Sequence, residues 1–406
     1  MARLLGVCAL LGVVIALGFV GFEQALHHGQ HYLWVTLAGR HPSNIVVIGL
    51  ATAGGLALGL ALRFVPGHGG QHPGDGHDPL AGGGDAHVPA VLGSLVVGFV
   101  GLVGGASLGP EGAVLPVAAG ISVLAGRSLR VSQSMSPLVK AAGLGALLAA
   151  MFGSPLAGVV PLMELIPAGA VPTMAMLLLP SLTAAATAVL TLQVLGTEPI
   201  GRLPLDYGQF HAIHLLWAVI IGVVAGAVGL AIDRITTSLR RGTRRLDARS
   251  VVLTATVGGL VLGVLYVIGG PEVRFSGIPE LLALIQRTDR AWPALLAVGV
   301  KLLATGWCLA VGYRGGKIFP VVFAGGATGL AVHLAFHSIP MPLAVAVGLA
   351  AAMATAMGTP ATAALITASL LSPALLPLAL IGIVTAHSVH LLADQLAPPA
   401  VAATER

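Results

Sequence analysis

The sequence predicts an all-α, polytopic membrane protein with an internal duplication. Apolar residues make up 56% of the 406 positions and charged residues only 9%, whereas a soluble domain carries roughly 25% charged residues. Long charge-free stretches follow one another along the chain, and 56 glycines and 26 prolines interrupt many of them. Gly and Pro are common in membrane helices, especially where helices are broken. This composition excludes a soluble enzyme, a disordered chain and an ordinary nucleic-acid-binding protein.

The charge-free stretches place the expected helices in order. Residues 4–22 carry no charge over 19 positions, which is enough to span a bilayer, so we interpret them as a first helix and not as a signal peptide. Residues 318–393 contain no Asp, Glu, Lys or Arg over 76 positions. As one helix they would be roughly 114 Å long, so this stretch must fold back at Pro340, Pro342 and Pro360. About ten to fifteen helical segments result, several of them too short to span. The other expected spans are 43–62, 88–110, 141–163, 165–197, 207–232 and 250–271.

Polar segments set the organisation and orientation of the chain. Residues 64–87 are rich in Gly, His, Asp and Pro and predict a loop. Six arginines fall between 234 and 249, which by the positive-inside rule predicts a cytoplasmic loop over 233–249. This concentration accounts for the net charge of +5 without a nucleic-acid partner. The expected parts are an N-terminal helix and linker (1–44), a first half (45–200), a linking helix with the basic cytoplasmic loop (201–250), a second half (251–396) and a tail (397–406).

Two chain breaks with the same spacing indicate the duplication. The segment GASLGPEGAVLP contains Pro110, and Pro155 follows 45 residues later in MFGSPLAGVVPL. The segment GYRGGKIFPVVF contains Gly315, and Pro360 follows 45 residues later in MGTPATAALITA. Matched interruptions in two halves are typical of a duplicated transporter or channel. Chance similarity within a Gly- and Ala-rich chain is the alternative.

Both breaks have the features of a helix that begins inside the membrane. Such a helix leaves its first N–H groups unsatisfied, and these groups together with the helix dipole attract an anion. Pro110 suits a first turn because it has no N–H, and Gly109 and Gly112 allow the backbone to come close to a ligand. Gly316 precedes a second helix start at Lys317. Two such starts that meet would form an anion site; breaks that serve packing alone are the alternative.

Charged side chains lie next to both breaks. Glu111 follows 23 charge-free residues, and a carboxylate within a membrane segment is expensive and indicates function. At a helix N-terminus it would compete with an anion and act as a gate; an interfacial loop glutamate is the alternative. Arg314 and Lys317 flank the second start, where they either raise anion occupancy or pair with Glu111 or Glu164.

These segments resemble motifs of the CLC chloride channel and transporter family. GASLGPEGAVLP resembles its G-[KR]-E-G-P motif, and MFGSPLAGVVPLMEL its N-A-P-L-A-G helix. GGKIFP resembles its G-x-F-x-P motif, and MGTPATAALITASL its later P-L-T-G segment. The order and spacing match over about residues 45–393, and the details look most like a short bacterial branch assigned to ion transport.

The resemblance implies an architecture and an activity. The expected fold is a CLC-type inverted repeat whose broken helices meet near the bilayer midplane. The expected protein is a homodimer in a bacterial inner (plasma) membrane, with a pore in each subunit. It would transport chloride or another small inorganic anion, with lipid as its surroundings and no cofactor or metal. It would not be an enzyme.

The resemblance also implies site residues. Glu111 corresponds to the external gating glutamate, and backbone amides at Glu111–Gly112 and at Lys317, Ile318 and Phe319 would bind the anion. His68, in GHGG, occupies the position of the family's anion-binding serine; a loop histidine is the alternative.

The sequence departs from the family's motifs at several positions. Pro110 replaces a basic residue, Ala113 a proline and Ile318 a phenylalanine, and no tyrosine follows Tyr313 to match the family's pore tyrosine. Because the ligation implied by the resemblance uses backbone N–H groups, the side-chain changes before and after the glutamate need not abolish it. The missing tyrosine means that the central site must be built differently.

Proton coupling stays open at this stage. The inner glutamate of the family's antiporters aligns with Leu165, and Glu164 lies one residue earlier, about 100° away around a helix. An apolar residue there is more typical of a channel, but Glu164 is a possible proton path, so a proton-coupled antiporter is the alternative function.

Two further classes are less consistent with the residues. An intramembrane metal-dependent hydrolase would use His387 and His390, but these histidines have no nearby carboxylate in sequence and match no zinc motif. A cation transporter would need carboxylates along its path, whereas helix N-termini repel cations.

Overall fold

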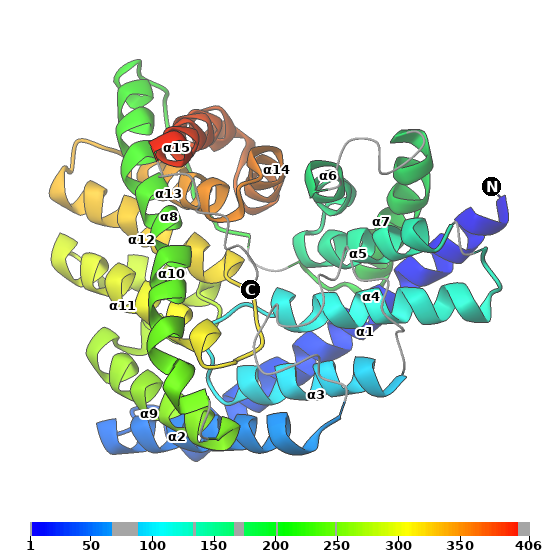
Figure 1. Cartoon of the computed structure of the whole chain (residues 1–406). Helices are drawn as coiled ribbons and strands as arrows, with labels where there is room; N and C mark the ends of the chain where they lie inside the picture. Colours follow the sequence, from blue (N-terminus) through cyan, green and yellow to red (C-terminus); the bar gives the residue numbers. More distant parts are fainter. Residues whose placement is uncertain are drawn as a thin grey trace.

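The computed structural model describes residues 2–66, 88–132, 135–165, 174–199, 202–247 and 250–396, and these ranges are almost entirely helical (Figure 1). They contain fifteen α-helices, at the upper end of the expected number. The bounds are α1 Ala2–His31, continued by a π-helical segment Tyr32–Leu37, α2 Asn44–Phe64, α3 Val88–Val103, α4 Glu111–Ser128, α5 Ser136–Phe152, α6 Pro155–Leu165, α7 Met174–Leu195, α8 Ile213–Asp247, α9 Val251–Gly269, α10 Ile278–Arg287, α11 Ala291–Ala310, α12 Ile318–Ala335, α13 Met341–Met357, α14 Pro360–Leu370 and α15 Leu376–Leu396.

Eight segments of the described chain are long and apolar enough to cross a membrane. Helices α3, α5, α6, α13 and α14 are apolar but shorter. The combination of full spans and short apolar helices confirms a multi-pass membrane protein with broken helices.

The helix lengths agree with the duplication expected from the sequence. Helices α4 and α12 each have 18 residues, α5 and α13 each have 17, and α6 and α14 each have 11. The turn after the second member of each series is also the same, because Gly153 and Gly358 both have φ of +68°. Only glycine adopts this left-handed conformation without strain. A single expected span over 141–163 is therefore wrong: Gly153 ends α5 and Pro155 begins α6.

The long charge-free stretch also divides as expected. Helix α12 ends at Ala335, α13 begins at Met341 after Pro340, and α14 begins at Pro360. Proline suits each start because its missing N–H would have no helical partner.

The segment expected as a basic loop is helical in its described part. Helix α8 has 35 residues and is roughly 52 Å long, well beyond the ~30 Å hydrocarbon core. Its arginine-rich end, 233–247, continues the spanning helix because arginine is a good helix former. Charge marks where the chain leaves the hydrocarbon, but it does not end the helix.

A buried lysine organises the turn before α10. Lys301 of α11 is fully buried, and its Nζ donates to the carbonyl oxygens of Val273, Arg274 and Phe275 at 3.2, 3.0 and 2.7 Å. The same ammonium lies 5.2 Å from the centre of the Phe323 ring on α12. One cation thus satisfies three buried carbonyls and joins α11, the turn and α12.

Replacing this cation with an apolar side chain of similar length tests its structural role. In Lys301→Met the three carbonyls lose their donor, which costs on the order of 1–3 kcal/mol for each buried group left unsatisfied. We expect a clear drop in the thermal unfolding midpoint in detergent. Arg290→Met, at an exposed position just before the same helix, is the control and keeps the wild-type midpoint. An unchanged midpoint in Lys301→Met contradicts this role.

Candidate functional site

The two chain breaks meet through their backbones. The Gly109 N–H donates to the Gly316 carbonyl at 2.9 Å, and the Gly316 N–H donates to the Gly109 carbonyl at 2.9 Å. This antiparallel bridge fixes the residues before α4 and α12 side by side. As the sequence predicted, the two intramembrane helix starts lie together.

Glycine is required where the breaks cross. A Cβ on Gly112 would lie 2.1 Å from the Gly315 carbonyl oxygen. A Cβ on Gly316 would lie 2.1 Å from the Glu111 carboxylate. These distances are far below van der Waals contact, so the Gly-rich composition of both motifs has a steric cause.

Buried donors hold the turn before α4. The Tyr266 hydroxyl of α9 donates to the Gly105 carbonyl at 2.5 Å. The Thr305 hydroxyl of α11 donates to the Ser107 carbonyl at 3.0 Å. Turns buried in a membrane protein need such partners for their backbone groups, and these bonds attach the start of α4 to the second half of the chain.

The Glu111 side chain reaches from one helix start to the other. Glu111 is 2% exposed and is the first residue of α4. Its Oε1 accepts a hydrogen bond from the Ile318 N–H, the first residue of α12, at 2.9 Å. Its Oε2 is buried and has no hydrogen-bond partner. A carboxylate therefore occupies the N-terminus of α12, where the helix dipole favours negative charge.

The sequence matches one protein-family model over most of its length. The family model described as voltage gated chloride channel matches residues 53–391. The chain belongs to this family. It is 34% identical over 328 residues to a protein named "Putative ion-transport protein YfeO" in Shigella sonnei strain Ss046, a match that covers 78% of this chain and 75% of the relative. The same identity and coverage hold for the protein of that name in Escherichia coli O139:H28.

Solved CLC structures share the fold. A slow cyanobacterial Cl⁻/H⁺ antiporter has a TM-score of 0.82 at 22% identity, and the match covers 96% of this chain and 95% of that one. A CLC-type fluoride/proton antiporter has a TM-score of 0.71 at 20% identity, with the same coverage. A eukaryotic CLC transporter has a TM-score of 0.76 at 19% identity, covering 96% of this chain and 72% of that one. The predicted CLC fold and family are confirmed, and with them a role in ion transport.

The other predicted site residues lie at the start of α4, at the start of α12, or outside the described residues. Gly112 lies in the first turn of α4 against Gly315, and Phe319 is fully buried in the first turn of α12. Lys317 is the residue directly before α12. His68 lies outside the described residues.

Lys317 has a different partner from the two considered in sequence. Its Nζ lies 2.6 and 2.7 Å from the carboxylate oxygens of Asp233 on α8. Pairing with Glu111 or Glu164 is therefore wrong for Lys317. Asp233 was not predicted, although it is the first charged residue after the stretch 207–232 and could have been noted as such.

Glu164 binds the start of another short helix. Its Oε1 accepts from the Ala361 N–H at 2.9 Å, and its Oε2 accepts from the Thr362 N–H at 2.7 Å and from the Thr362 hydroxyl. The carboxylate thus satisfies the free N–H groups at the N-terminus of α14 and complements its dipole. This contact joins α6 to α14, the matching short helices of the two halves.

The histidine-based hydrolase gains no support. The rings of His387 and His390 are 5.9 Å apart on α15. Within the described ranges, no three His, Cys, Asp or Glu side chains gather in a way that could hold a metal ion.

Proposed function

We propose that this CLC protein moves chloride or another small inorganic anion through a pathway within each subunit, and that Glu111 is its gate. The observation that carries the proposal is the hydrogen bond from the Ile318 N–H to the Glu111 carboxylate at 2.9 Å. A site that binds a carboxylate through a helix N-terminus also suits a small inorganic anion.

The gate follows from competition for the same donor. While the Glu111 carboxylate accepts from Ile318, a permeating anion cannot use that N–H group. Protonation or rotation of the side chain frees it. The proposed ligands of the anion are backbone groups at Gly112, Lys317, Ile318 and Phe319, with His68 as an additional donor.

Proton-coupled antiport is the second candidate. It is favoured by the Oε2 of Glu111, which is buried and has no hydrogen-bond partner. When this oxygen is protonated, it can donate a hydrogen bond, so a neutral Glu111 suits the buried position. The similar cyanobacterial structure is also described as a Cl⁻/H⁺ antiporter. Glu164 stays a possible proton path, although three donors already hold its carboxylate.

The setting proposed for this activity is a homodimer in the plasma membrane of a bacterium. The arginine-rich end of α8 would face the cytoplasm, because basic segments are retained there.

Flux measurements on the purified protein test the proposal. The protein is reconstituted in proteoliposomes loaded with chloride, fluoride or nitrate, with a proton gradient imposed or absent, and protein-free vesicles serve as the control. We expect efflux of at least one anion above the control. Uphill anion movement driven by protons would identify the antiporter, and absence of flux for all three anions contradicts the proposal.

A further inference from the structure

A second carboxylate lies on α1, a helix that contacts α4, the helix that begins with the gate. Glu23 of α1 is half-buried, and its Oε2 is buried without a hydrogen-bond partner. A carboxylate directly after the charge-free stretch 4–22 is expensive to keep in a membrane segment and indicates function, yet gating by Glu111 alone does not use it.

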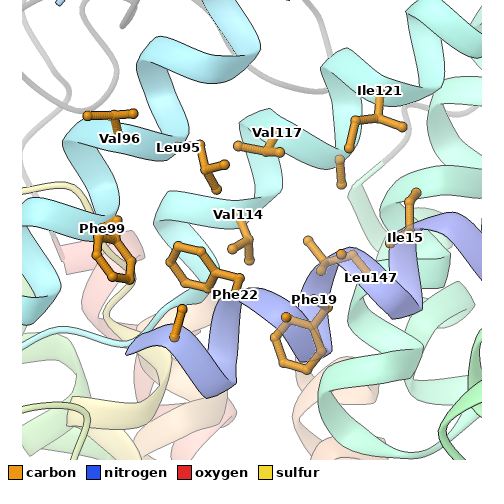
Figure 2. Close-up of a pocket in the computed structure, with 14 residues that line it drawn as sticks. Ile15, Phe19, Phe22, Leu95, Val96, Phe99, Val114, Val117, Ile121 and Leu147 are labelled. Carbon is orange, nitrogen blue, oxygen red and sulfur yellow. The ribbon is translucent and has the colours of Figure 1, made fainter. Parts of the chain in front are cut away.

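The packing of α1 against α4 relates the positions of the two carboxylates. Arg3, near the start of α1, donates to the carbonyl of Leu129, directly after α4, at 2.8 Å. Farther along, Ile15 and Ile121 lie toward one end of a shared cavity and Phe22 and Val114 toward the other, so the two helices run in opposite directions (Figure 2). Glu23 lies 20 residues beyond Arg3, about 30 Å along the helix, and Glu111 lies 18 residues before Leu129, about 27 Å. Glu23 and Glu111 thus both lie toward the end of the cavity marked by Phe22 and Val114.

The neighbours of the two carboxylates line one cavity (Figure 2). Phe22, next to Glu23, and Val114, three residues after Glu111, both face it, and Phe22 packs edge-on against Phe99 of α3 at 6.0 Å. The cavity has a volume of about 480 Å³, and all 14 of its lining residues, from α1, α3, α4 and α5, are apolar. None of these lining side chains can accept a proton.

The opposite direction is polar. Beyond Glu23, helix α1 carries Gln24, His27, His28, Gln30 and His31 in its last two turns. His27 lies four residues after Glu23, on the same side of the helix, and it is exposed. Polar side chains therefore follow Glu23 along α1 as far as the end of the helix.

Few titratable residues lie on the described helices that pack against α1. Helices α3 and α7 contain none, and α5 contains one, Lys140. On the continuation of α1, the Arg274 guanidinium lies 5.5 Å from the centre of the Trp34 ring, three turns beyond Glu23. Lys317, next to the Ile318 donor, is paired with Asp233. Two carboxylates in a region of low dielectric favour states in which one of them holds a proton.

We propose that Glu23 is the proton-transfer partner of the gate. In one direction the Glu23 carboxylic acid gives its proton to the Glu111 carboxylate, which leaves Glu23 ionised and Glu111 neutral and detached from the Ile318 N–H. Glu23 then takes a proton from water or from a protonated His27 at the polar end of α1. The reverse sequence deprotonates the gate. This inference rests on the proposed role of Glu111.

The test separates proton movement from anion movement. Chloride-driven proton uptake and chloride efflux are measured in proteoliposomes of the wild type, Glu23→Gln and Glu23→Asp. Glu198→Gln is the matched control, because Glu198 is exposed in the connection after α7. We expect proton uptake to fall about tenfold or more in Glu23→Gln, as for the loss of a proton-transfer group, while chloride efflux stays near the wild-type rate. Glu23→Asp should recover part of the uptake, and Glu198→Gln should match the wild type.

Three outcomes would overturn the role of Glu23. These are unchanged proton uptake in Glu23→Gln, an equal fall in both fluxes, and a wild type that moves chloride without protons; the last would leave anion transport intact.

A wild type that moves no anion would contradict the proposed function instead, and infrared spectroscopy then tests Glu23 separately. The carbonyl band that Glu111→Gln removes should titrate over a pH range displaced by about half a unit or more in Glu23→Gln. An unchanged range would overturn the pairing.

Discussion

In Glu111→Gln, anion efflux down a gradient should be about tenfold faster than in the wild type. A hydrogen bond to a carboxylate is worth roughly 1.5–3 kcal/mol and one to a neutral acceptor roughly 0.5–1.5, so the glutamine binds the Ile318 N–H more weakly by about 1.4 kcal/mol, a factor of ten in occupancy. The anion then competes with a weaker occupant for the N-terminus of α12. The measurement is efflux from proteoliposomes followed with an ion-selective electrode.

The pH dependence of the same efflux gives a second, independent readout. Acidification protonates Glu111 and removes the competing charge, so wild-type efflux should rise as the pH falls. The glutamine in Glu111→Gln cannot ionise, so the efflux of this variant should stay constant over the pH values at which wild-type efflux rises. Glu198→Gln removes an exposed carboxylate and should keep the wild-type rate and pH profile. If Glu111→Gln is no faster than the wild type and keeps its pH profile, Glu111 is not the gate.

The sequence predicts those parts of the fold in which charged residues and prolines determine where a helix begins or ends. A stretch without charge must remain in the hydrocarbon, and the breaks before Pro340 and Pro360 follow because one helix of that length cannot fit. The turn at Gly153 was missed, since both helices that it separates are apolar and hydropathy does not change there. The helical end of α8 was missed for the opposite reason: hydropathy changes at Asp233, but the backbone hydrogen-bonding pattern does not.

The site was predictable only in part, because a costly buried charge can be recognised in the sequence but its distant partner cannot. Glu111 is conspicuous because a lone carboxylate in a charge-free stretch is costly wherever the chain folds. Its acceptor role toward Ile318 depends on two helix starts 207 residues apart, and only the resemblance to the CLC motifs brought them together. The partners of Lys317 and Glu164 lie 84 and about 200 residues away and match no such motif. Glu23 was passed over because it stands at the end of a predicted span, where an interfacial charge is ordinary.

Gly112→Ala should abolish anion transport, with a fall of more than about tenfold. The new Cβ would lie 2.1 Å from the Gly315 carbonyl oxygen and 2.7 Å from the Gly316 nitrogen, and both are backbone atoms that cannot rotate away. The start of α12 must move away from α4, at a cost of about 1–3 kcal/mol for an overpacked methyl group. That movement strains the Gly109–Gly316 bridge and draws the Ile318 N–H away from Glu111.

The same helix supplies the control for this substitution. A Cβ on Gly126, in the last turn of α4, would meet only a Val139 methyl group at 3.8 Å, an ordinary contact. Gly126→Ala should therefore transport like the wild type, and its unfolding midpoint should rise slightly because alanine favours a helix over glycine by about 1 kcal/mol. The two variants make the same chemical change 14 positions apart on one helix, so a difference between them comes from the crossing of the two breaks. Wild-type transport by Gly112→Ala would mean that the close approach of α4 and α12 is not needed to form the anion pathway.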